Sequence, residues 1–247
     1  MDEFIVARGA RIAVISAQNK RGGFMFRTTL LIAAIALSMP AHAQQAPMID
    51  GPALAGPPPA AGSAREAADR LSMHPQVSEE RLAQARADLA FDPFAMFQPV
   101  LGESFTRERF PRTAAVLSAA VAGVNPAVNA AKDHYNRQRP YVEDMSLLRC
   151  DSPQNPGTGG SYPTGHGAGG WTLALVLAEL IPSRADAILQ RGRDFGDSRV
   201  ICGYHFPSDV EASRLIAAGG VARLHGDAAF RRQLDAARRE LARAYRD

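Results

Sequence analysis

Lysine is almost absent from this chain. Of the 28 basic residues among 247, only Lys20 and Lys132 are lysines, and the others are arginines. Arginine suits planar, bidentate contacts, whereas lysine supplies a compact point charge. Outside the N-terminal region Lys132 is the one exception, so the sequence singles it out as a position where a small cation is required.

Long apolar runs are also missing after residue 43, where no segment stays apolar for the ~20 residues of a membrane-spanning helix. The earlier stretch MFRTTLLIAAIALSMPAHA, residues 25–43, has a basic start at Arg27 and a short apolar run. It ends in the small-residue pattern Ala-His-Ala, which completes the features of a secretory signal peptide. We expect cleavage after Ala43 and export to the periplasm, with residues 1–24 as an upstream extension. A buried N-terminal helix is the alternative.

An excess of charge of one sign disappears with that segment. The whole chain has a formal net charge of +3 and a pI near 9.1. Residues 1–43 hold five basic and two acidic residues, so the totals of 28 and 25 fall to 23 of each. Binding to nucleic acid or to an anionic membrane through bulk charge therefore loses its support.

Cysteine is scarce, with only Cys150 and Cys202, both in the part expected to be exported. In an oxidising compartment an even count favours a disulfide, and closing a loop of about fifty residues stabilises by roughly 4 kcal/mol. Two buried free thiols are the alternative. A shared zinc site is disfavoured because zinc-binding cysteine pairs usually lie two to four residues apart.

Strand-like alternation is scarce and no internal repeat is present, so the sequence predicts an all-α protein with a single compact helical domain, residues 64–247. Residues 44–63 are rich in Pro, Gly and Ala and predict an extended or wrapping leader rather than a helix. Apolar periodicity and start signals predict helices over residues 78–89, 113–123, 125–139, 165–180, 182–195, 206–224 and 227–245.

The first stretch with reactive groups is AAKDHYNRQRPYVED, residues 130–144. Lys132 and Arg139 are seven residues apart, nearly two helical turns, so we expect both on one face of a helix that Pro140 ends. No acidic residue is spaced to neutralise both. They are either a solvated surface pair or two cations that face an anion.

The second stretch is GSYPTGHGAGG, residues 160–170. Pro163 stops the preceding segment, Thr164 can cap, and Gly165 with His166 opens an apolar helix. Free N–H groups and the positive end of the dipole suit a phosphate oxygen at such an N-terminus. The Thr164 hydroxyl adds a donor. A purely structural His166 is the alternative.

The third stretch is SRVICGYHFPSDV, residues 198–210, in which Arg199 precedes His205 by six residues and Asp209 follows it by four. If Pro207 marks the first helical turn, the Asp209 carboxylate can accept from the Nδ1–H of His205. The Nε2 atom is then left as an unprotonated nucleophile. A satisfied His–Asp pair in the core is the alternative.

Together these stretches supply two histidines, three cations, a hydroxyl group, a helix N-terminus and one carboxylate. Phosphoryl transfer needs neutralised equatorial oxygens, an in-line nucleophile and an acid for the leaving group. This combination of residue types therefore favours chemistry on a tetrahedral oxyanion.

The same motifs resemble those of a known family. The pattern Lys-x₆-Arg-Pro at 132–140, Pro-Thr-Gly-His at 163–166 and Ser-Arg-x₅-His-x₃-Asp at 198–209 is similar to the three motifs of the type 2 phosphatidic-acid phosphatase (PAP2) superfamily. More narrowly, GSYPTGH and SRVICGYHFPSD resemble the class A bacterial non-specific acid phosphatases. Two departures are Thr164, where the family usually has serine, and Gly167, where it commonly has threonine. We expect them to modulate activity rather than abolish it.

The resemblance implies a secreted enzyme that hydrolyses a broad range of organic phosphomonoesters at mildly acidic pH, with phosphotransfer as a side activity and no metal or cofactor. His205 would attack phosphorus and form a phosphohistidine, Asp209 would orient it, and His166 would protonate the leaving alcohol. The residues implied to hold the phosphoryl oxygens are Lys132, Arg139, Thr164, Gly165 and Arg199.

Four alternative functions compete with this interpretation. A vanadium-dependent haloperoxidase has a similar site because vanadate mimics phosphate, but such chains are generally larger. A membrane lipid phosphatase would need several spans. A secreted oxyanion-binding protein that has lost most catalysis would fit the departures at Thr164 and Gly167. A metal site built from His134, His166 and His205 lacks a metal-typical spacing. The oligomeric state is left open, a homo-oligomer included.

Overall fold

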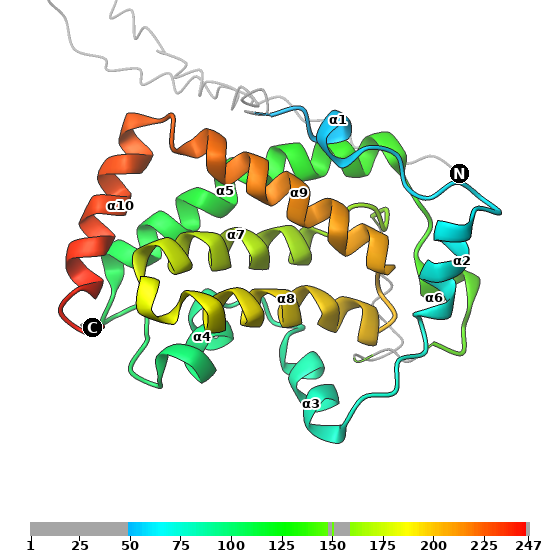
Figure 1. Cartoon of the computed structure of the whole chain (residues 1–247), viewed down its shortest axis with the longest axis horizontal. Helices are drawn as coiled ribbons and strands as arrows, with labels where there is room; N and C mark the ends of the chain where they lie inside the picture. The colour runs from blue at the N-terminus through cyan, green and yellow to red at the C-terminus, as the bar shows by residue number, and fades with distance from the viewer. Residues whose placement is uncertain (1–48, 148–149, 151–158, 246–247) are drawn as a thin grey trace, which may run out of the picture. The chain divides into compact units, whose positions relative to one another are not determined.

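The computed structural model describes residues 49–147, 150 and 159–245. These residues form ten α-helices and one 3₁₀ helix, and no strand occurs among them (Figure 1). The predicted all-α class is therefore confirmed. The predicted extension and signal peptide, residues 1–43, lie outside the described residues, as do residues 151–158 of the predicted loop.

Several predicted boundaries agree closely with the structure, in particular those of α3, α7 and α9. The helices are α1 (Gly51–Ala55), α2 (Ala64–Leu71), α3 (Glu79–Ala87), α4 (Pro93–Leu101), α5 (Pro111–Tyr135), α6 (Pro140–Glu143), α7 (Gly165–Leu180), η1 (Pro182–Arg184), α8 (Ala185–Ile201), α9 (Pro207–Leu224) and α10 (Ala228–Leu241).

Helix α7 lies at the centre of the fold, in contact with α5, α8, α9 and α10. Figure 1 shows it between α8 and α9, with α5 behind. Leu173, Val176 and Leu177 are fully buried there, and each such side chain contributes ~1.5–3 kcal/mol relative to exposure. The first turn of α7, which the sequence marks as an anion site, therefore belongs to a helix that is buried in the core.

Helix α5 differs from the prediction in two ways. A break at Asn125-Pro126 was expected, but one helix runs through Pro126. An interior proline costs about 3 kcal/mol, and burial of Val124 and Val128 on either side of it offsets that cost. The helix also ends earlier, at Tyr135, where Asn136 takes a left-handed conformation with φ of 40°.

That early end corrects the expected placement of two cations. Lys132 lies on α5, whereas Arg139 lies at the N-cap of α6, so the two do not share one helical face. They reach the same pocket from two elements because the chain turns at Asn136. The predicted convergence is right, but the predicted geometry is wrong.

The apolar character of α5 also exceeds the expectation from sequence. The stretch Pro111–Glu143 is long and apolar enough to pass a length-and-composition test for a membrane span. A core helix meets the same test, and α5 packs against α1, α7, α9 and α10.

The leader packs onto this helix. Its part from residue 49 onward contains the short helix α1, capped by Asp50, which its Pro- and Gly-rich composition did not predict. The Tyr135 hydroxyl donates to the Pro52 carbonyl at 2.9 Å, and the Tyr162 hydroxyl donates to the Ala55 carbonyl at 2.9 Å. The leader is therefore fixed to the two elements that flank the predicted site.

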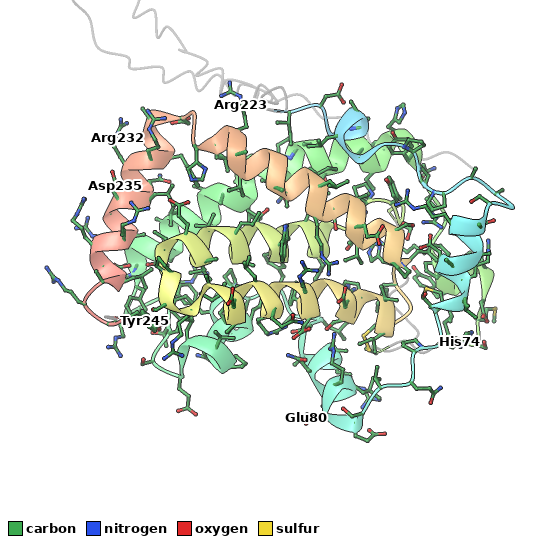
Figure 2. The ribbon with its side chains drawn as sticks, in the orientation of Figure 1. His74, Glu80, Arg223, Arg232, Asp235 and Tyr245 are labelled. Atoms are coloured by element: carbon green, nitrogen blue, oxygen red, sulfur yellow. A yellow bond between two sulfur atoms is a disulfide. The ribbon has the colours of Figure 1, made fainter. Side chains whose placement is uncertain are left out.

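The C-terminal helix α10 buries the apolar face predicted for it, but it ends at Leu241 and not at Tyr245. Asp227 caps α10, and Phe230, Leu234, Ala237 and Leu241 are buried. Figure 2 shows Arg232 and Asp235 on the outward side. Tyr245 lies beyond the helix and donates its hydroxyl to the Leu101 carbonyl at 2.9 Å.

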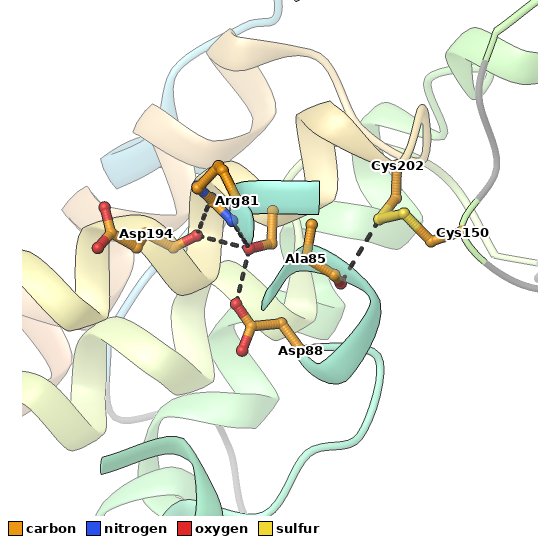
Figure 3. Close-up of a disulfide and its surroundings, with 7 residues drawn as sticks. Arg81, Ala85, Asp88, Cys150, Asp194 and Cys202 are labelled. Carbon is orange, nitrogen blue, oxygen red and sulfur yellow. Dashed lines mark hydrogen bonds between the residues drawn. A yellow bond between two sulfur atoms is a disulfide. The ribbon is translucent and has the colours of Figure 1, made fainter. Parts of the chain in front are cut away.

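Cys150 and Cys202 form the predicted disulfide, with their Cα atoms 5.0 Å apart (Figure 3). The Cys202 sulfur lies 3.6 Å from the Ala85 carbonyl of α3. The bridge therefore joins the loop after α6 to the end of α8, next to α3.

Candidate active site

The residues predicted to carry chemistry gather around one pocket of about 650 Å³. Six line it, namely Lys132, Arg139, Gly165, His166, Arg199 and His205. Thr164 and Asp209 are fully buried behind that wall. The remaining wall is mainly apolar, and it is formed by Leu89, Phe91, Val121, Asn125, Val128, Asn129, Gly169 and Tyr204.

His205 lies at the base of the pocket with 4% of its surface exposed. It directly precedes the residue that caps α9, and its own N–H donates to the Arg199 carbonyl at 3.3 Å. The Nδ1 atom is 2.7 Å from the Ser161 carbonyl, which can only accept, so Nδ1 carries the proton. The Nε2 atom is therefore the free base, and it lies 3.0 Å from Nη1 of Arg139.

Asp209 does not contact His205 as directly as expected. Its Oδ2 atom is 3.5 Å from Nδ1 of His205, farther than the Ser161 carbonyl. The same oxygen accepts the N–H of Phe206 at 2.9 Å and the Ser161 hydroxyl in a short hydrogen bond. The carboxylate thus fixes the backbone and the hydroxyl group that surround the imidazole, and it also places a negative charge near the ring.

Burial lowers the pKa of His205 to about 3. The Asp209 carboxylate raises that pKa, but the cations Arg139 and Lys132 lower it further. His205 is therefore neutral at mildly acidic pH, as a nitrogen nucleophile must be.

Lys132 supports the loop that precedes α7. Its Nζ atom donates to the carbonyls of Gly160 and Pro163 at 2.8 and 2.7 Å. An ammonium group has three donors, so one remains for the pocket. Burial, together with the charge of Arg139, lowers the pKa of Lys132 to about 8, which keeps the group charged at mildly acidic pH.

The two arginines complete the cationic wall. Arg139 donates from Nε to the Gly159 carbonyl at 3.0 Å and from Nη1 to the Tyr204 carbonyl at 3.1 Å. Arg199 is buried, and its guanidinium carbon lies 4.6 Å from the centre of the Tyr204 ring. Backbone carbonyls hold the Arg139 guanidinium and the Tyr204 ring face packs against that of Arg199, so two arginines bring positive charge to the pocket.

His166 stands in different surroundings. Its Nε2 is 3.3 Å from the Leu89 carbonyl, and its ring contacts Phe91 edge-on and Phe195 in parallel. Burial lowers its pKa to about 4, and the charge of Arg199 lowers it too. The expected acid is therefore mostly neutral at mildly acidic pH until an anion approaches.

The start of α7 explains both departures from the family pattern. The Thr164 hydroxyl caps the helix by accepting the Gly167 N–H at 3.3 Å, and it does not line the pocket. A Cβ atom at Gly167 would lie 2.4 Å from the Thr164 methyl carbon and 2.7 Å from Ser213 Oγ. The threonine methyl thus occupies space that only glycine leaves free. Contact of Thr164 with a phosphoryl oxygen stays a prediction.

Gly165 is the first residue of α7, where the N–H has no partner within the helix. A Cβ built there meets no atom within 4 Å. Its backbone is thus open to a ligand in the pocket.

Sequence reasoning missed a group of polar residues behind His205, which are Asp69, Arg137, Ser161 and Ser208. Arg137 and Ser161 lie inside stretches that were already singled out, and their proximity to other site residues was a usable signal. Asp69 lies on α2, far away in sequence, and no local pattern marks it.

Metal-ligand clusters are absent from the part of the chain that the structure describes, where no three His, Cys, Asp or Glu side chains gather in a metal-binding group.

Comparison with known proteins identifies the family of this chain. The PAP2 superfamily pattern matches residues 113–231. An acid phosphatase of Zymomonas mobilis is 37% identical over 203 residues, which cover 76% of this chain and 74% of that protein. A non-specific acid phosphatase of Providencia stuartii is 38% identical over 206 residues, 79% and 82% of the two chains. One from Salmonella typhimurium is 40% identical over 158 residues, 63% of each. This chain belongs to the PAP2 superfamily, together with these bacterial acid phosphatases.

Proposed function

We propose that this protein is a class A non-specific acid phosphatase, which hydrolyses phosphomonoesters through a phosphohistidine formed on His205. The names of its relatives support phosphatase activity in general. One observation carries the residue-level assignment. The unprotonated Nε2 of His205 faces a pocket in which Lys132, Arg139 and Arg199 present positive charge.

In the first step, the Nε2 lone pair forms a bond to phosphorus as the bond from phosphorus to the ester oxygen breaks. The Arg139 guanidinium, 3.0 Å from Nε2, gives up that contact and neutralises a phosphoryl oxygen. His166 donates a proton to the departing oxygen. The products of this step are a free alcohol and a phosphohistidine.

In the second step, water attacks phosphorus and the phosphorus–nitrogen bond breaks. The now neutral His166 accepts the proton of the water, and inorganic phosphate leaves. Another alcohol in place of water would give phosphotransfer by the same route, so we include phosphotransfer as a side activity.

The pocket supports a broad range of substrates. Its volume of about 650 Å³ greatly exceeds the space of one phosphate group. Apolar side chains such as Phe91, Val121 and Val128 form part of the wall, and they can contact an alcohol group without specific hydrogen bonds.

We further propose that the chain is exported and cleaved after Ala43. The Cys150–Cys202 disulfide is the observation that supports an oxidising compartment. N-terminal sequencing of protein purified from the periplasm tests it, since a first residue other than Gln44 would contradict the cleavage site.

The function is tested with purified protein and p-nitrophenyl phosphate at pH 5 to 7, with and without EDTA. We expect turnover that resists EDTA and a loss of at least about 10⁴-fold in His205→Ala. His74→Ala is the matched control, because His74 is exposed and does not line the pocket. Acid-quenched protein should carry phosphate on His205.

Three results would overturn the proposal. Turnover that EDTA abolishes would contradict side-chain cations as the sole electrophiles. Absence of turnover together with vanadate binding would identify an oxyanion-binding protein, and vanadate-dependent oxidation of bromide by peroxide would identify a haloperoxidase.

A further inference from the structure

One guanidinium group lies between two buried carboxylates beneath the pocket. Arg137 donates from Nη2 to Asp69 at 2.9 Å and from Nη1 to Asp209 at 2.8 Å. The side chains of Arg137, Asp69 and Asp209 are only 12%, 4% and 0% exposed. We call these three residues the carboxylate bridge.

Arg137 reaches His205 by two routes. Through its side chain it contacts Asp209, whose other oxygen lies 3.5 Å from Nδ1 of His205. Through its backbone carbonyl it accepts the Ser161 N–H at 2.7 Å, and the Ser161 carbonyl accepts the Nδ1 proton of His205. Both groups around the Nδ1 atom are therefore attached to the same arginine.

The far end of the bridge is fixed as well. Asp69 accepts the Ser208 N–H at 3.0 Å and the Ser208 hydroxyl, and that hydroxyl also lies 2.8 Å from Nη1 of Arg137. The Arg137 guanidinium carbon stacks 3.9 Å from the centre of the Phe206 ring. Phe206 and Ser208, at the N-terminus of α9, thus hold the guanidinium plane in one orientation.

The charges make the carboxylate bridge dependent on Arg137. Burial raises the pKa of Asp209, but the neighbouring imidazole of His205, the charge of Arg137 and the Ser161 hydroxyl outweigh burial and leave the pKa lowered. Without Arg137, two buried carboxylates would face each other with no cation between them, and one would take up a proton. A protonated Asp209 could no longer support the imidazole.

We propose that Arg137 is a positioning residue for phosphoryl transfer, held by Asp69 and acting on His205 through Asp209 and Ser161. This inference rests on the proposed function. It makes helix α2, which supplies Asp69, part of the catalytic assembly although it contributes no residue to the pocket wall.

A purely structural bridge would behave differently. It would change the stability of the fold, and the folded enzyme would keep its turnover. A positioning role lowers kcat of the folded enzyme and leaves phosphate binding intact, because phosphate faces Lys132, Arg139 and Arg199 instead. The two possibilities are distinguished by comparing the loss in kcat with the loss in phosphate affinity and in stability.

The experiment measures kcat for p-nitrophenyl phosphate, the inhibition constant of inorganic phosphate and the urea midpoint. In Arg137→Lys, a point charge can reach only one carboxylate at a time. We expect kcat to fall by about tenfold to 100-fold, as for the loss of other outer-shell orienting groups. The phosphate inhibition constant should change by less than about twofold.

Arg191→Lys is the matched control. Arg191 is a second buried arginine paired with a buried aspartate, Asp88, and it contacts neither His205 nor Asp209. We expect a similar loss in the urea midpoint and a kcat within about twofold of the wild type.

Asp69→Asn covers the case in which Arg137→Lys fails to fold, because it keeps the shape and removes one charge. Its kcat should fall several-fold with the phosphate inhibition constant unchanged. Arg137→Ala combined with Asp69→Asn should regain stability over Arg137→Ala alone without regaining kcat.

Three outcomes overturn the inference. They are a kcat in Arg137→Lys within twofold of the wild type, a kcat restored together with stability in the double variant, or parallel losses of kcat and phosphate affinity. If the wild-type protein itself shows no turnover, the proposed function fails, and that result is distinct from an active wild type with an active Arg137→Lys.

Discussion

The two histidines of the pocket stand in contrasting surroundings. His205 has a carboxylate, a backbone carbonyl and a guanidinium group within 3.5 Å. His166 has one carbonyl at 3.3 Å and otherwise packs against the rings of Phe91 and Phe195.

The difference corresponds to the two roles proposed for them. A nucleophile must keep one tautomer and one orientation, so polar contacts fix His205. An acid that later becomes a base must change its protonation state. The apolar walls around His166 do not fix that state, so the charge of a bound phosphoryl group controls the pKa of the ring. The contrast predicts that damage behind His205 abolishes chemistry, whereas damage behind His166 changes stability and pH response.

Among changes behind the two histidines, the largest expected effect comes from Asp209→Asn. The amide keeps the shape but loses the negative charge that favours the Nδ1-protonated tautomer of His205. We expect kcat to fall by on the order of 10³–10⁴-fold, the size seen when a triad aspartate is neutralised, measured with p-nitrophenyl phosphate on protein shown to be folded by circular dichroism.

The matched change on the other side is Asp88→Asn. Asp88 pairs with Arg191 and accepts the Ser198 hydroxyl at 2.6 Å, one residue before the Leu89 carbonyl that contacts His166. Figure 3 shows Asp88 in the same hydrogen-bonded group as Arg81 and Asp194, close to the disulfide. We expect a fall in kcat of less than about tenfold. Equal losses in the two variants would contradict the contrast.

A middle-sized effect concerns pH. His166 must carry a proton to act as an acid, and in the free site that proton is lost as pH rises through the pKa of about 4. Burial, Arg199 and Arg139 lower this pKa, while the Leu89 carbonyl and Asp88 raise it. A bound phosphoryl group adds negative charge and raises it further.

We therefore expect kcat to decline at a higher pH than kcat/KM does, because kcat reports the complex and kcat/KM the free enzyme. Two phosphomonoesters with different second pKa values separate substrate ionisation from that of His166. Identical declines of kcat and kcat/KM with both substrates would contradict a rise in the pKa of His166 when substrate binds.

The smallest effect concerns the first turn of α7, in which His166 lies. Gly167→Ala places a Cβ 2.4 Å from the Thr164 methyl carbon and 2.7 Å from Ser213 Oγ. We expect a loss of about 1–3 kcal/mol in the free energy of unfolding, as for overpacking elsewhere. Thr164→Ser removes the methyl carbon and should recover part of that loss in the double variant, measured by urea unfolding. Additive losses would show that the two positions are independent.

Much of the fold and site could be predicted from local sequence. Start signals placed α7 and α9 correctly because Thr164 and Pro207 act within their own first turns. Two cysteines in one domain predicted their disulfide. The six pocket residues were found because their charges and spacing are visible without knowledge of packing.

The rest depends on tertiary contacts. Pro126 would end an isolated helix, but buried neighbours keep α5 continuous. Asp69 gains its role only where α2 meets the N-terminus of α9. Each difference arises where a local pattern competes with a contact that is distant in sequence.

The scarcity of lysine has a practical consequence. With cleavage after Ala43, the mature protein carries one ε-amino group, that of Lys132, inside the pocket. Its pKa of about 8 gives it a larger reactive fraction near that pH than an ordinary surface lysine has. An acylating reagent would therefore modify only the pocket and the α-amino terminus. Protection of Lys132 by phosphate, read as a change in intact mass, would report pocket occupancy without any chromogenic substrate.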